Sequence, residues 1–449
     1  MYFDGNGTTP LHPAVHKAIT ESLDCYGNPS TPSDQGKRAK AVIDDANESI
    51  KAHVFGVPPE CGLVVWTGSG TEGNHTAVLL SLLQDTHTSH TQSTKKNKKA
   101  RAKNPPHVVT TTVEHPAILK HLASLEDLGL VSVTRVKPRG GEIVVEDVAE
   151  AVGDTTVLVT VIRAQVRSRR GAKRSDVHRS CWCSKLISAP HFRPTQNETG
   201  YLADVAGIAK AVKAVNPRCL VHSDAAQAAS KVDCRVSEGG GLEGVDLITV
   251  VGHKLGAPKG VAALYVADSV SAANVEQGGV LLKGGGQMKG LRSGTENVPY
   301  IAGMGAAAKE VAAGLRYVPQ YRRVVTRLLV ALQGGLPEGV EAVFNCGSDS
   351  KGLPQTLSVG FRGAPGLTSG HIMRECMDRG VIVAAGSACD ANKKEVDYSQ
   401  ILKEFGVGAE VGVSTLRVSC GFWNTEEEGE LVGRTVADVV SKYVLDSKK

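Results

Sequence analysis

The chain has 449 residues, about three times the length of a typical domain, which predicts two domains, one of them large. Its apolar fraction of 41% is ordinary for a chain with a buried core, and no apolar run has the length that crosses a membrane. The net charge of +5 depends on residues 166–196, which hold eight Lys or Arg residues against one acid, so the charge does not indicate nucleic-acid binding.

The ten cysteines are scattered along the chain. This distribution argues against a disulfide scaffold and predicts a reducing compartment. The first six residues have neither the basic start nor the apolar stretch of a signal peptide, so we expect a cytoplasmic protein. Cys181 and Cys183 have no second Cys/His pair at zinc spacing, and we predict no metal site.

Short apolar runs rich in β-branched residues alternate with helical patterns through the first 270 residues. Such alternation predicts an α/β fold whose mainly parallel sheet is covered by helices on both faces. The expected strands are residues 63–66, 107–111, 157–161, 219–222, 245–250 and 261–266, and the expected helices include residues 71–83 and 201–215.

The pattern changes after about residue 305 and predicts a smaller α+β unit. Its expected elements are a long helix over residues 302–334, strands near 356–360 and 381–384, and a terminal helix from Thr425. We therefore predict a large domain over residues 12–310 and a small domain formed by residues 1–11 and 311–449.

Two segments have the character of insertions. Residues 86–106 are polar and rich in lysine, which predicts a solvated or disordered loop. The basic segment 166–196 has neither a strand nor a helix period.

Polar residues that suit one kind of chemistry follow the predicted strands. Lys254 comes directly after the strand at 245–250, where a low dielectric lets a lysine lose its charge and form a Schiff base with an aldehyde. Asp224 follows another strand and suits the carboxylate that pyridoxal phosphate (PLP) needs at its ring nitrogen, although a helix N-cap is an alternative role. Gln227, one turn later, could reach the phenolic oxygen of the cofactor.

A glycine turn and a histidine complete this set. The turn at residues 67–74 contains Gly70 and Thr71 and opens a predicted helix, whose free N–H groups can bind a phosphate. His115 follows another strand and could stack on a pyridine ring. Because the carboxyl ends of strands in a doubly wound sheet share one crevice, we expect these groups to meet there.

The order and spacing of these groups resemble those of the fold-type I, class V aminotransferase-like PLP enzymes, and among them the cysteine desulfurase and selenocysteine lyase branch. The resemblance runs from Tyr2 to about Val440, apart from the two insertions. It implies a seven-stranded, mainly parallel sheet in the large domain. The motifs that carry it are residues 4–10, 26–30, 71–74, 113–115, 196–200, 222–227, 252–254, 284–287, 291–297, 386–389 and 416–419.

The resemblance also implies a role for individual residues. Lys254 matches the Schiff-base lysine, Cys389 the loop cysteine that receives sulfur or selenium, and Arg417 the arginine that holds the substrate carboxylate, assisted by Asn6. The groups matched to the cofactor are Gly70, Thr71, His115, Asn197, Asp224, Gln227, His253 and Lys254, and among them His115 is also expected to take part in catalysis and Asn197 to contact the substrate. Thr295 matches a phosphate contact made across a dimer interface, which implies a homodimer.

The implied reaction converts L-selenocysteine and a reductant to L-alanine and selenide. We favour the lyase branch because residues 294–297 match its pattern and because an insertion at 86–106 resembles the animal lyases. Three alternatives stay open at this point. They are a cysteine desulfurase that forms a persulfide on Cys389, another fold-type I PLP enzyme, and an inactive protein of this fold. A protein that accepts the selenium or sulfur is a possible partner.

The basic segment interrupts one motif of the family. Ala164-Gln165 is separated by 31 residues from Asn197-Glu-Thr-Gly200, and an insertion at the ring should displace or strain Asn197. One hypothesis is a translated, in-frame intron, which sequencing of the transcript would test. The other is a genuine surface loop, which loop entropy tolerates.

Overall fold

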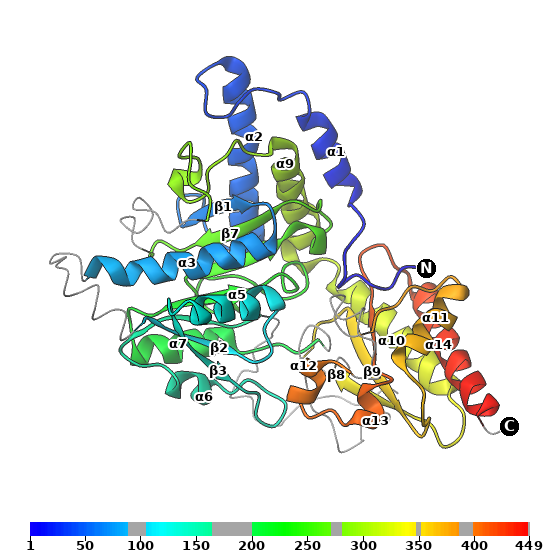
Figure 1. Cartoon of the computed structure of the whole chain (residues 1–449). Coiled ribbons are helices and arrows are strands. Elements are labelled where there is room, and N and C mark those ends of the chain that lie inside the picture. The colour runs from blue at the N-terminus through cyan, green and yellow to red at the C-terminus, as the bar shows by residue number, and fades with distance from the viewer. Residues whose placement is uncertain (89–104, 164–199, 271–280, 347–351, 386–397, 448–449) are drawn as a thin grey trace, which may run out of the picture.

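Figure 1 shows the protein as a computed structural model that describes residues 1–88, 105–163, 200–270, 281–346, 352–385 and 398–447. The basic segment 166–196 lies outside the described residues, together with Asn197, Cys389 and most of the predicted loop at 86–106. Across the described ranges, no helix combines the length and apolar character needed to cross a bilayer.

A seven-stranded sheet forms the centre of the larger part of the chain, in the order β1-β7-β6-β5-β4-β2-β3. Strand β7 is antiparallel to both of its neighbours and the other pairs are parallel, which confirms the predicted α/β sheet. The strands are β1 (Leu63–Thr67), β2 (His107–Thr111), β3 (Ser132–Val136), β4 (Thr156–Thr160), β5 (Leu220–Asp224), β6 (Leu247–Val251) and β7 (Ala262–Val266). We did not predict β3, because an edge strand carries polar residues and lacks the apolar run of a central strand.

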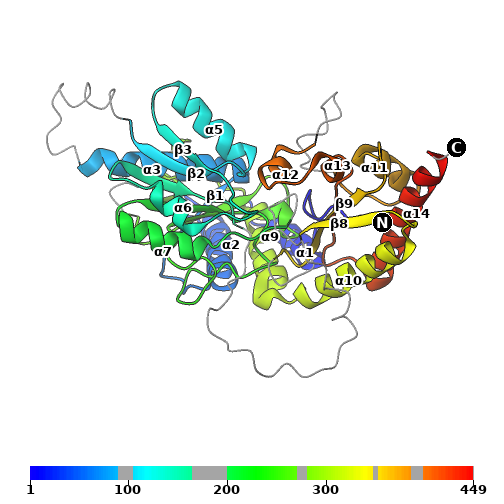
Figure 2. The same ribbon diagram turned by 90° about the horizontal axis from the view of Figure 1, so that it is seen from below.

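Helices cover both faces of this sheet, as Figures 1 and 2 show. Neighbouring strand residues point to opposite faces, so Val65 packs under α3 and α5 whereas Val64 belongs to the core under α2, α7 and α9. Helix α3 begins as predicted but continues past residue 83 to Thr88. The helices around the sheet are α1 (Pro13–Ser22), α2 (Asp34–Ile50), η1 (Lys51–Phe55), α3 (Gly70–Thr88), α5 (Pro116–Asp127), α6 (Val145–Glu150), α7 (Val205–Val215), η4 (Gly252–Lys254), η5 (Met288–Gly290) and α9 (Val298–Ala307).

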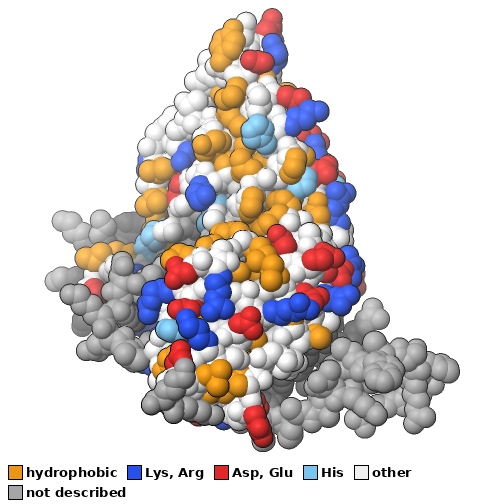
Figure 3. Space-filling view, turned by 90° about the vertical axis from the view of Figure 1, so that its right-hand side faces the viewer, with side chains coloured by type: hydrophobic (Ala, Val, Ile, Leu, Met, Phe, Trp, Pro, Cys, Tyr) orange, Lys and Arg blue, Asp and Glu red, His pale blue; other side chains and the backbone are white. Residues whose placement is uncertain are grey.

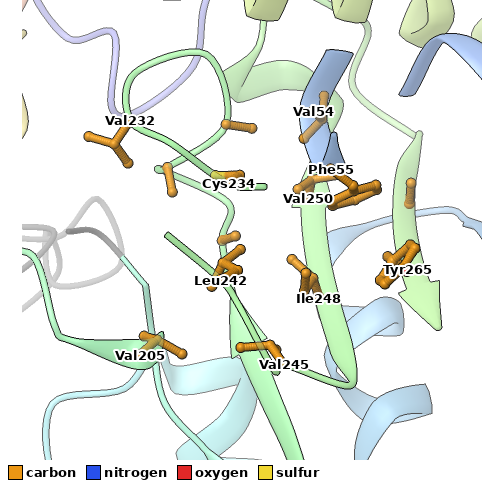
Figure 4. Packing of buried hydrophobic residues seen from close by; sticks show 14 of the residues in the cluster. Val54, Phe55, Val205, Val232, Cys234, Leu242, Val245, Ile248, Val250 and Tyr265 are labelled. Carbon is orange, nitrogen blue, oxygen red and sulfur yellow. The ribbon is translucent and has the colours of Figure 1, made fainter. Parts of the chain in front are cut away.

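The core beneath β6 and β7 fixes the strand end that carries Lys254. Figure 4 shows Ile248 and Val250 of β6 beside Phe55 of η1, and the rings of Phe55 and Tyr265 have their centroids 4.8 Å apart. Full burial of one such side chain contributes about 1.5–3 kcal/mol to folding. The packing therefore gives β6 a firm position at the edge of the candidate site.

A second, three-stranded antiparallel sheet lies in the remaining part of the chain, in the order β10-β9-β8. Figure 2 shows helices α10, α11 and α14 beside this sheet, and Phe3 from the N-terminus is buried in the core between the sheet and these helices. On the surface, Figure 3 shows charges of both signs interspersed on the side of the molecule that lies to the right in Figure 1. The elements are α10 (Val318–Gly335), β8 (Glu341–Cys346), β9 (Thr356–Arg362), α11 (Ser369–Asp378), α12 (Gln400–Glu404), α13 (Ala409–Gly412), β10 (Leu416–Ser419) and α14 (Glu426–Asp446). The domain boundaries at residues 11–12 and 310–311 stay a prediction.

The single helix predicted over residues 302–334 is wrong. Helix α9 ends at Ala307 and continues as the π-helix η6 (Ala308–Ala312), and the 3₁₀ turn η7 (Ala313–Leu315) then separates it from α10. Gly314 and Leu315 have φ values of +61° and +52°, in the left-handed region that a right-handed helix cannot include.

Residues 381–384 do not form the predicted strand. They make two isolated bridges, from Ile382 to Tyr2 and from Ala384 to Arg417. The apolar pattern arose because Val381, Val383 and Ala384 are buried, while the segment pairs with two different neighbours at one residue each.

Candidate active site

A cavity of about 410 Å³ lies at one edge of the large sheet. Its walls come from the segments that follow β1, β2, β4, β5 and β6, and from the start of β7. Because β7 runs antiparallel, its beginning lies at the same edge as the ends of the parallel strands. The cavity therefore occupies the crevice at the strand carboxyl ends that we predicted for the site.

Seven of the predicted site residues line this cavity, and they are Gly70, Thr71, His115, Asp224, Gln227, His253 and Lys254. Asn6, Thr295 and Arg417 are not among the lining residues. Asn197 and Cys389 lie outside the described residues. The roles that we assigned to individual residues stay predictions.

Asp224 is the buried acid of the cavity and is only 4% exposed. Its Oδ2 accepts a hydrogen bond from Asn74 Nδ2 at 2.8 Å, and its Oδ1 accepts one from the Ala226 N–H at 3.0 Å. The bond to Ala226 is a local turn contact, related to the N-cap role that was the alternative for Asp224. Both bonds stabilise a carboxylate, so the side chain can face a cationic ring nitrogen.

Lys254 is held by the N-terminal segment of the chain. Its Nζ donates to the carbonyl oxygens of Asn6 and Gly7, each at 2.5 Å. The backbone of the same segment also bonds to the lysine turn, since the Thr9 N–H donates to the His253 carbonyl at 2.9 Å. The far end of the chain in sequence thereby fixes the direction of the lysine.

Two histidines line the cavity. Burial, followed by the charges of Lys254, Lys259 and Lys231, lowers the pKa of His253 to about 4, so its ring is neutral at pH 7. His115 caps helix α5, and its Nδ1 accepts from the Ala117 N–H at 3.1 Å. A neutral His115 therefore carries its proton on Nε2.

The cavity fits a PLP molecule. The N-terminus of α3 supplies free N–H groups for a phosphate, and a Cβ added at Gly70 would come within 2.5 Å of Val251 Cγ2, so the backbone there needs glycine. Asp224 offers a negative charge and Lys254 an amine from other walls. Asn74 Oδ1 is buried and has no hydrogen-bond partner among the described residues, which leaves one acceptor for a bound group.

Arg417 and Asn6 lie buried beside this site. The Arg417 guanidinium, 2% exposed, forms an ion pair with Asp4 Oδ1 at 2.7 Å, and its Nε has no partner in the described part of the chain. The side-chain amide of Asn6 instead bonds to Thr356 Oγ1 and to Gln355 Nε2. Asn6 therefore presents its backbone carbonyl oxygen, and not its side chain, to Lys254.

Thr295 is exposed, and its neighbours Gly294 and Glu296 line a smaller cavity of about 40 Å³. That cavity shares Gly68 and Gly260 with the larger one. The loop that carries Thr295 thus lies close to the candidate phosphate site, without Thr295 itself reaching it within one chain.

Sequence reasoning assigned no role to three buried polar residues near the cavity. Asn74 holds Asp224, and its only sequence signal was its place in the motif 71–74. Glu114 accepts from Thr111 Oγ1 at 2.6 Å and from the Ile162 N–H at 2.9 Å, and burial raises its pKa to about 8. The third is Lys231, a lone lysine in an alanine-rich stretch.

His222 gives the folded protein a dependence on pH. It is fully buried in β5, where its ring contacts Thr160 Oγ1 at 2.8 Å and Thr249 Oγ1 at 3.1 Å, and burial lowers its pKa from 6.5 to about 4. Between these pH values the unfolded chain binds a proton that the folded chain excludes. The contribution is therefore present above pH 6.5 and is lost as the pH falls towards 4.

We expect His222→Gln to remove this dependence while keeping a hydrogen-bonding side chain. The free energy of unfolding in urea should fall more steeply for the wild type than for the variant between pH 6.5 and 4, by up to about 1.4 kcal/mol per pH unit. If the free energy of unfolding depended on pH equally in the wild type and the variant between pH 6.5 and 4, His222 would not be the source of this dependence.

Comparison with known proteins extends the match to almost the whole chain. The family described as aminotransferase class-V matches residues 1–172 and 185–432, and the unmatched interval lies within the basic segment. The selenocysteine lyase of Homo sapiens is 31% identical over 467 residues, covering 98% of this chain and 92% of the human protein. The cysteine desulfurase of Trichormus azollae is 29% identical, covering 98% of this chain and 93% of that protein.

Solved structures show the same fold. A NifS-like protein superposes with a TM-score of 0.75 at 24% identity, covering 98% of this chain and 99% of its own. The cysteine desulfurase of Thermococcus onnurineus superposes with a TM-score of 0.71 at 18% identity, covering 98% of this chain and 95% of its own.

Proposed function

The chain belongs to the aminotransferase class-V family, and from this premise we propose that it is a PLP-dependent selenocysteine lyase that converts L-selenocysteine to L-alanine and selenide with an external reductant. The observation that carries the proposal is the meeting of Lys254 and Asp224 in one cavity that fits the cofactor. The selenocysteine lyases of Homo sapiens and Bos taurus, each 31% identical, support the choice of substrate.

When bound, PLP supplies a conjugated ring that stores the electron pair released from the substrate α-carbon. Asp224 would keep the nitrogen of a bound ring protonated, because its buried carboxylate is stabilised by two hydrogen bonds. The glycine turn at Gly70 and Thr71 would hold the phosphate, and His115 and Gln227, which line other walls of the cavity, would orient the ring.

Lys254 anchors the cofactor and then, as a free amine, takes the proton from the substrate α-carbon. The carbonyl oxygens of Asn6 and Gly7 hold its Nζ by hydrogen bonds in the structure. Arg417 holds the substrate carboxylate, and the partnerless Nε is the part of its guanidinium that the Asp4 ion pair leaves open. Cys389 protonates the leaving selenium or attacks it as a thiolate.

We infer three further properties from the same matches. The protein is a homodimer in which Thr295 reaches the phosphate bound by the partner, in keeping with its exposed position beside the smaller cavity. It works in the cytoplasm, and a protein that accepts selenium or sulfur can be a partner. Co-purification and sedimentation measurements test these inferences.

Cysteine desulfuration is the second candidate function. It is supported by the Trichormus azollae desulfurase, whose 29% identity and 98% coverage of this chain nearly equal those of the lyases. In that reaction the Cys389 thiolate takes the sulfur of L-cysteine as a persulfide.

The deciding experiment measures alanine released from L-selenocysteine and from L-cysteine by the PLP-loaded protein. We expect selenocysteine to be strongly preferred. Comparable turnover of both substrates would favour the desulfurase, and bound PLP without turnover would favour an inactive protein of this fold.

Cys389→Ala should lower selenocysteine turnover about 10²-fold, at the lower end of the range for general acid catalysis, because a selenolate leaves readily even without a proton donor. Cys61→Ala serves as the matched control and should keep full turnover. It removes a partly buried thiol that precedes β1, at the opposite end of the strand from the glycine turn. Equal rates for the two variants would exclude Cys389 from the reaction.

A further inference from the structure

Lys231 is a buried lysine that no step of the proposed reaction uses. It is 5% exposed, and no carboxylate forms an ion pair with it in the described part of the chain. Burial of an unpaired ammonium is costly, so a lysine kept at such a position needs a compensating role. Its hydrogen bonds point to that role.

Two groups of the candidate site accept hydrogen bonds from Lys231. Its Nζ donates to the backbone carbonyl oxygen of Lys254 at 3.1 Å and to Oε1 of Gln227 at 3.4 Å. Gln227 in turn donates from Nε2 to the Asn6 carbonyl oxygen at 2.9 Å, the same oxygen that accepts from the Lys254 Nζ. Lys231 therefore contacts the turn of one site residue and the side chain of another.

These contacts fix which way the Gln227 amide points. An ammonium only donates hydrogen bonds and a carbonyl only accepts them. Rotating the amide by half a turn would place its NH₂ group against Lys231 and its oxygen against the Asn6 carbonyl, so both contacts would become repulsive. With the amide held as it is, Gln227 has a second N–H for an acceptor in the cavity that it lines.

We propose that Lys231 is a positioning residue of the active site, which sets the Gln227 amide as a hydrogen-bond donor towards the cofactor and holds the Lys254 turn. The proposal rests on the proposed PLP chemistry, but not on which amino acid is the substrate. Lys231 itself does not line the cavity and does not touch the reacting atoms.

The groups around Lys231 also make its charge sensitive to pH. Burial, and then the charge of Lys254, lower the pKa of Lys231 to about 7. Burial raises the pKa of the neighbouring Cys234 thiol to about 11, so it stays neutral and supplies no counter-charge. His253, whose pKa Lys231 helps to lower, is neutral as well. When it is protonated, Lys231 is thus a positive charge near Lys254 that neither neighbour cancels.

The test follows the visible absorbance of bound PLP as a function of pH in Lys231→Met. Removing a positive charge beside Lys254 should make protonation of the lysine–cofactor linkage easier, and we expect the titration midpoint to rise by about one pH unit. Turnover (kcat) should fall about tenfold, while KM changes less than about twofold, because Lys231 contacts no substrate group. Lys309→Met, which removes an exposed lysine paired with Asp45, should change none of these values.

A double-mutant cycle shows whether Lys231 acts through Gln227. In a Gln227→Ala background, Lys231→Met should reduce kcat by less than it does in the wild type, since only the contact with the Lys254 turn is left to lose. Should Lys231→Met fail to fold, Lys231→Gln and Lys231→Arg take its place, with Arg keeping the charge and the wild-type midpoint. An unchanged midpoint in the uncharged variant, or independent effects in the cycle, would overturn the proposal. A protein that binds PLP but does not act on selenocysteine would refute the lyase function and leave the absorbance titration as the test of this proposal.

Discussion

Lys254→Ala should reduce turnover of selenocysteine by at least about 10⁴-fold, because one amine both anchors the cofactor and moves the α-proton. Borohydride should fix PLP covalently to Lys254 of the wild type, where peptide mass mapping would find it, and should leave the variant without this label. Lys309→Ala, which removes an exposed ion pair with Asp45, should keep both label and turnover.

Two nearby lysines could carry the PLP label in place of Lys254, so the position of the label tests the assignment of the anchoring lysine. Lys259 also lines the cavity, and Lys231 lies just behind it. The Lys254 turn is the one tied to the N-terminal segment, through hydrogen bonds from its Nζ to two backbone carbonyl oxygens. A PLP label on Lys231 or Lys259 of the wild type would show that the anchoring lysine has been misassigned. Partial recovery of the variant by added primary amines would show that the missing group is the amine itself.

Much of the fold was predictable, because buried central strands carry their signal locally. The strands β1, β2 and β4 to β7 are apolar runs that the sequence shows directly. Features that depend on a single backbone angle, or on a position at the edge of the sheet, were not predictable from the sequence. The break before α10 depends on the left-handed residues Gly314 and Leu315, in a stretch whose side chains are compatible with a continuous helix.

The candidate site divides in the same way. Lys254, Asp224 and His115 were predictable because each follows a strand, and the carboxyl ends of parallel strands meet at one edge of the sheet. The hydrogen-bond and ion-pair partners of the candidate site residues were not predictable, since they depend on tertiary contacts. Asp4 meets Arg417 across 413 positions of sequence, and Asn74 meets Asp224 across 150.

Asp224→Ala should lower turnover about 10³-fold, as expected when a preorganised charge facing the reacting system is removed. PLP should still bind through Lys254 and the glycine turn, but the ring nitrogen would lose the carboxylate that keeps it protonated. The measurements are kcat on selenocysteine and the absorbance spectrum of the bound cofactor. A variant with near-normal kcat would remove Asp224 from the mechanism.

Asn74 allows the charge of Asp224 to be separated from its packing. In Asp224→Asn two amide groups can meet face to face, so part of any loss could come from the broken 2.8 Å hydrogen bond. The exchange variant, Asp224→Asn with Asn74→Asp, restores a carboxylate–amide pair of the same composition but places the charge on helix α3. We expect the exchange to recover the free energy of unfolding lost in Asp224→Asn, by about 1–3 kcal/mol, and to leave turnover low. Because residue 74 also lines the cavity, recovery of turnover together with stability would mean that a carboxylate at position 74 can replace one at position 224.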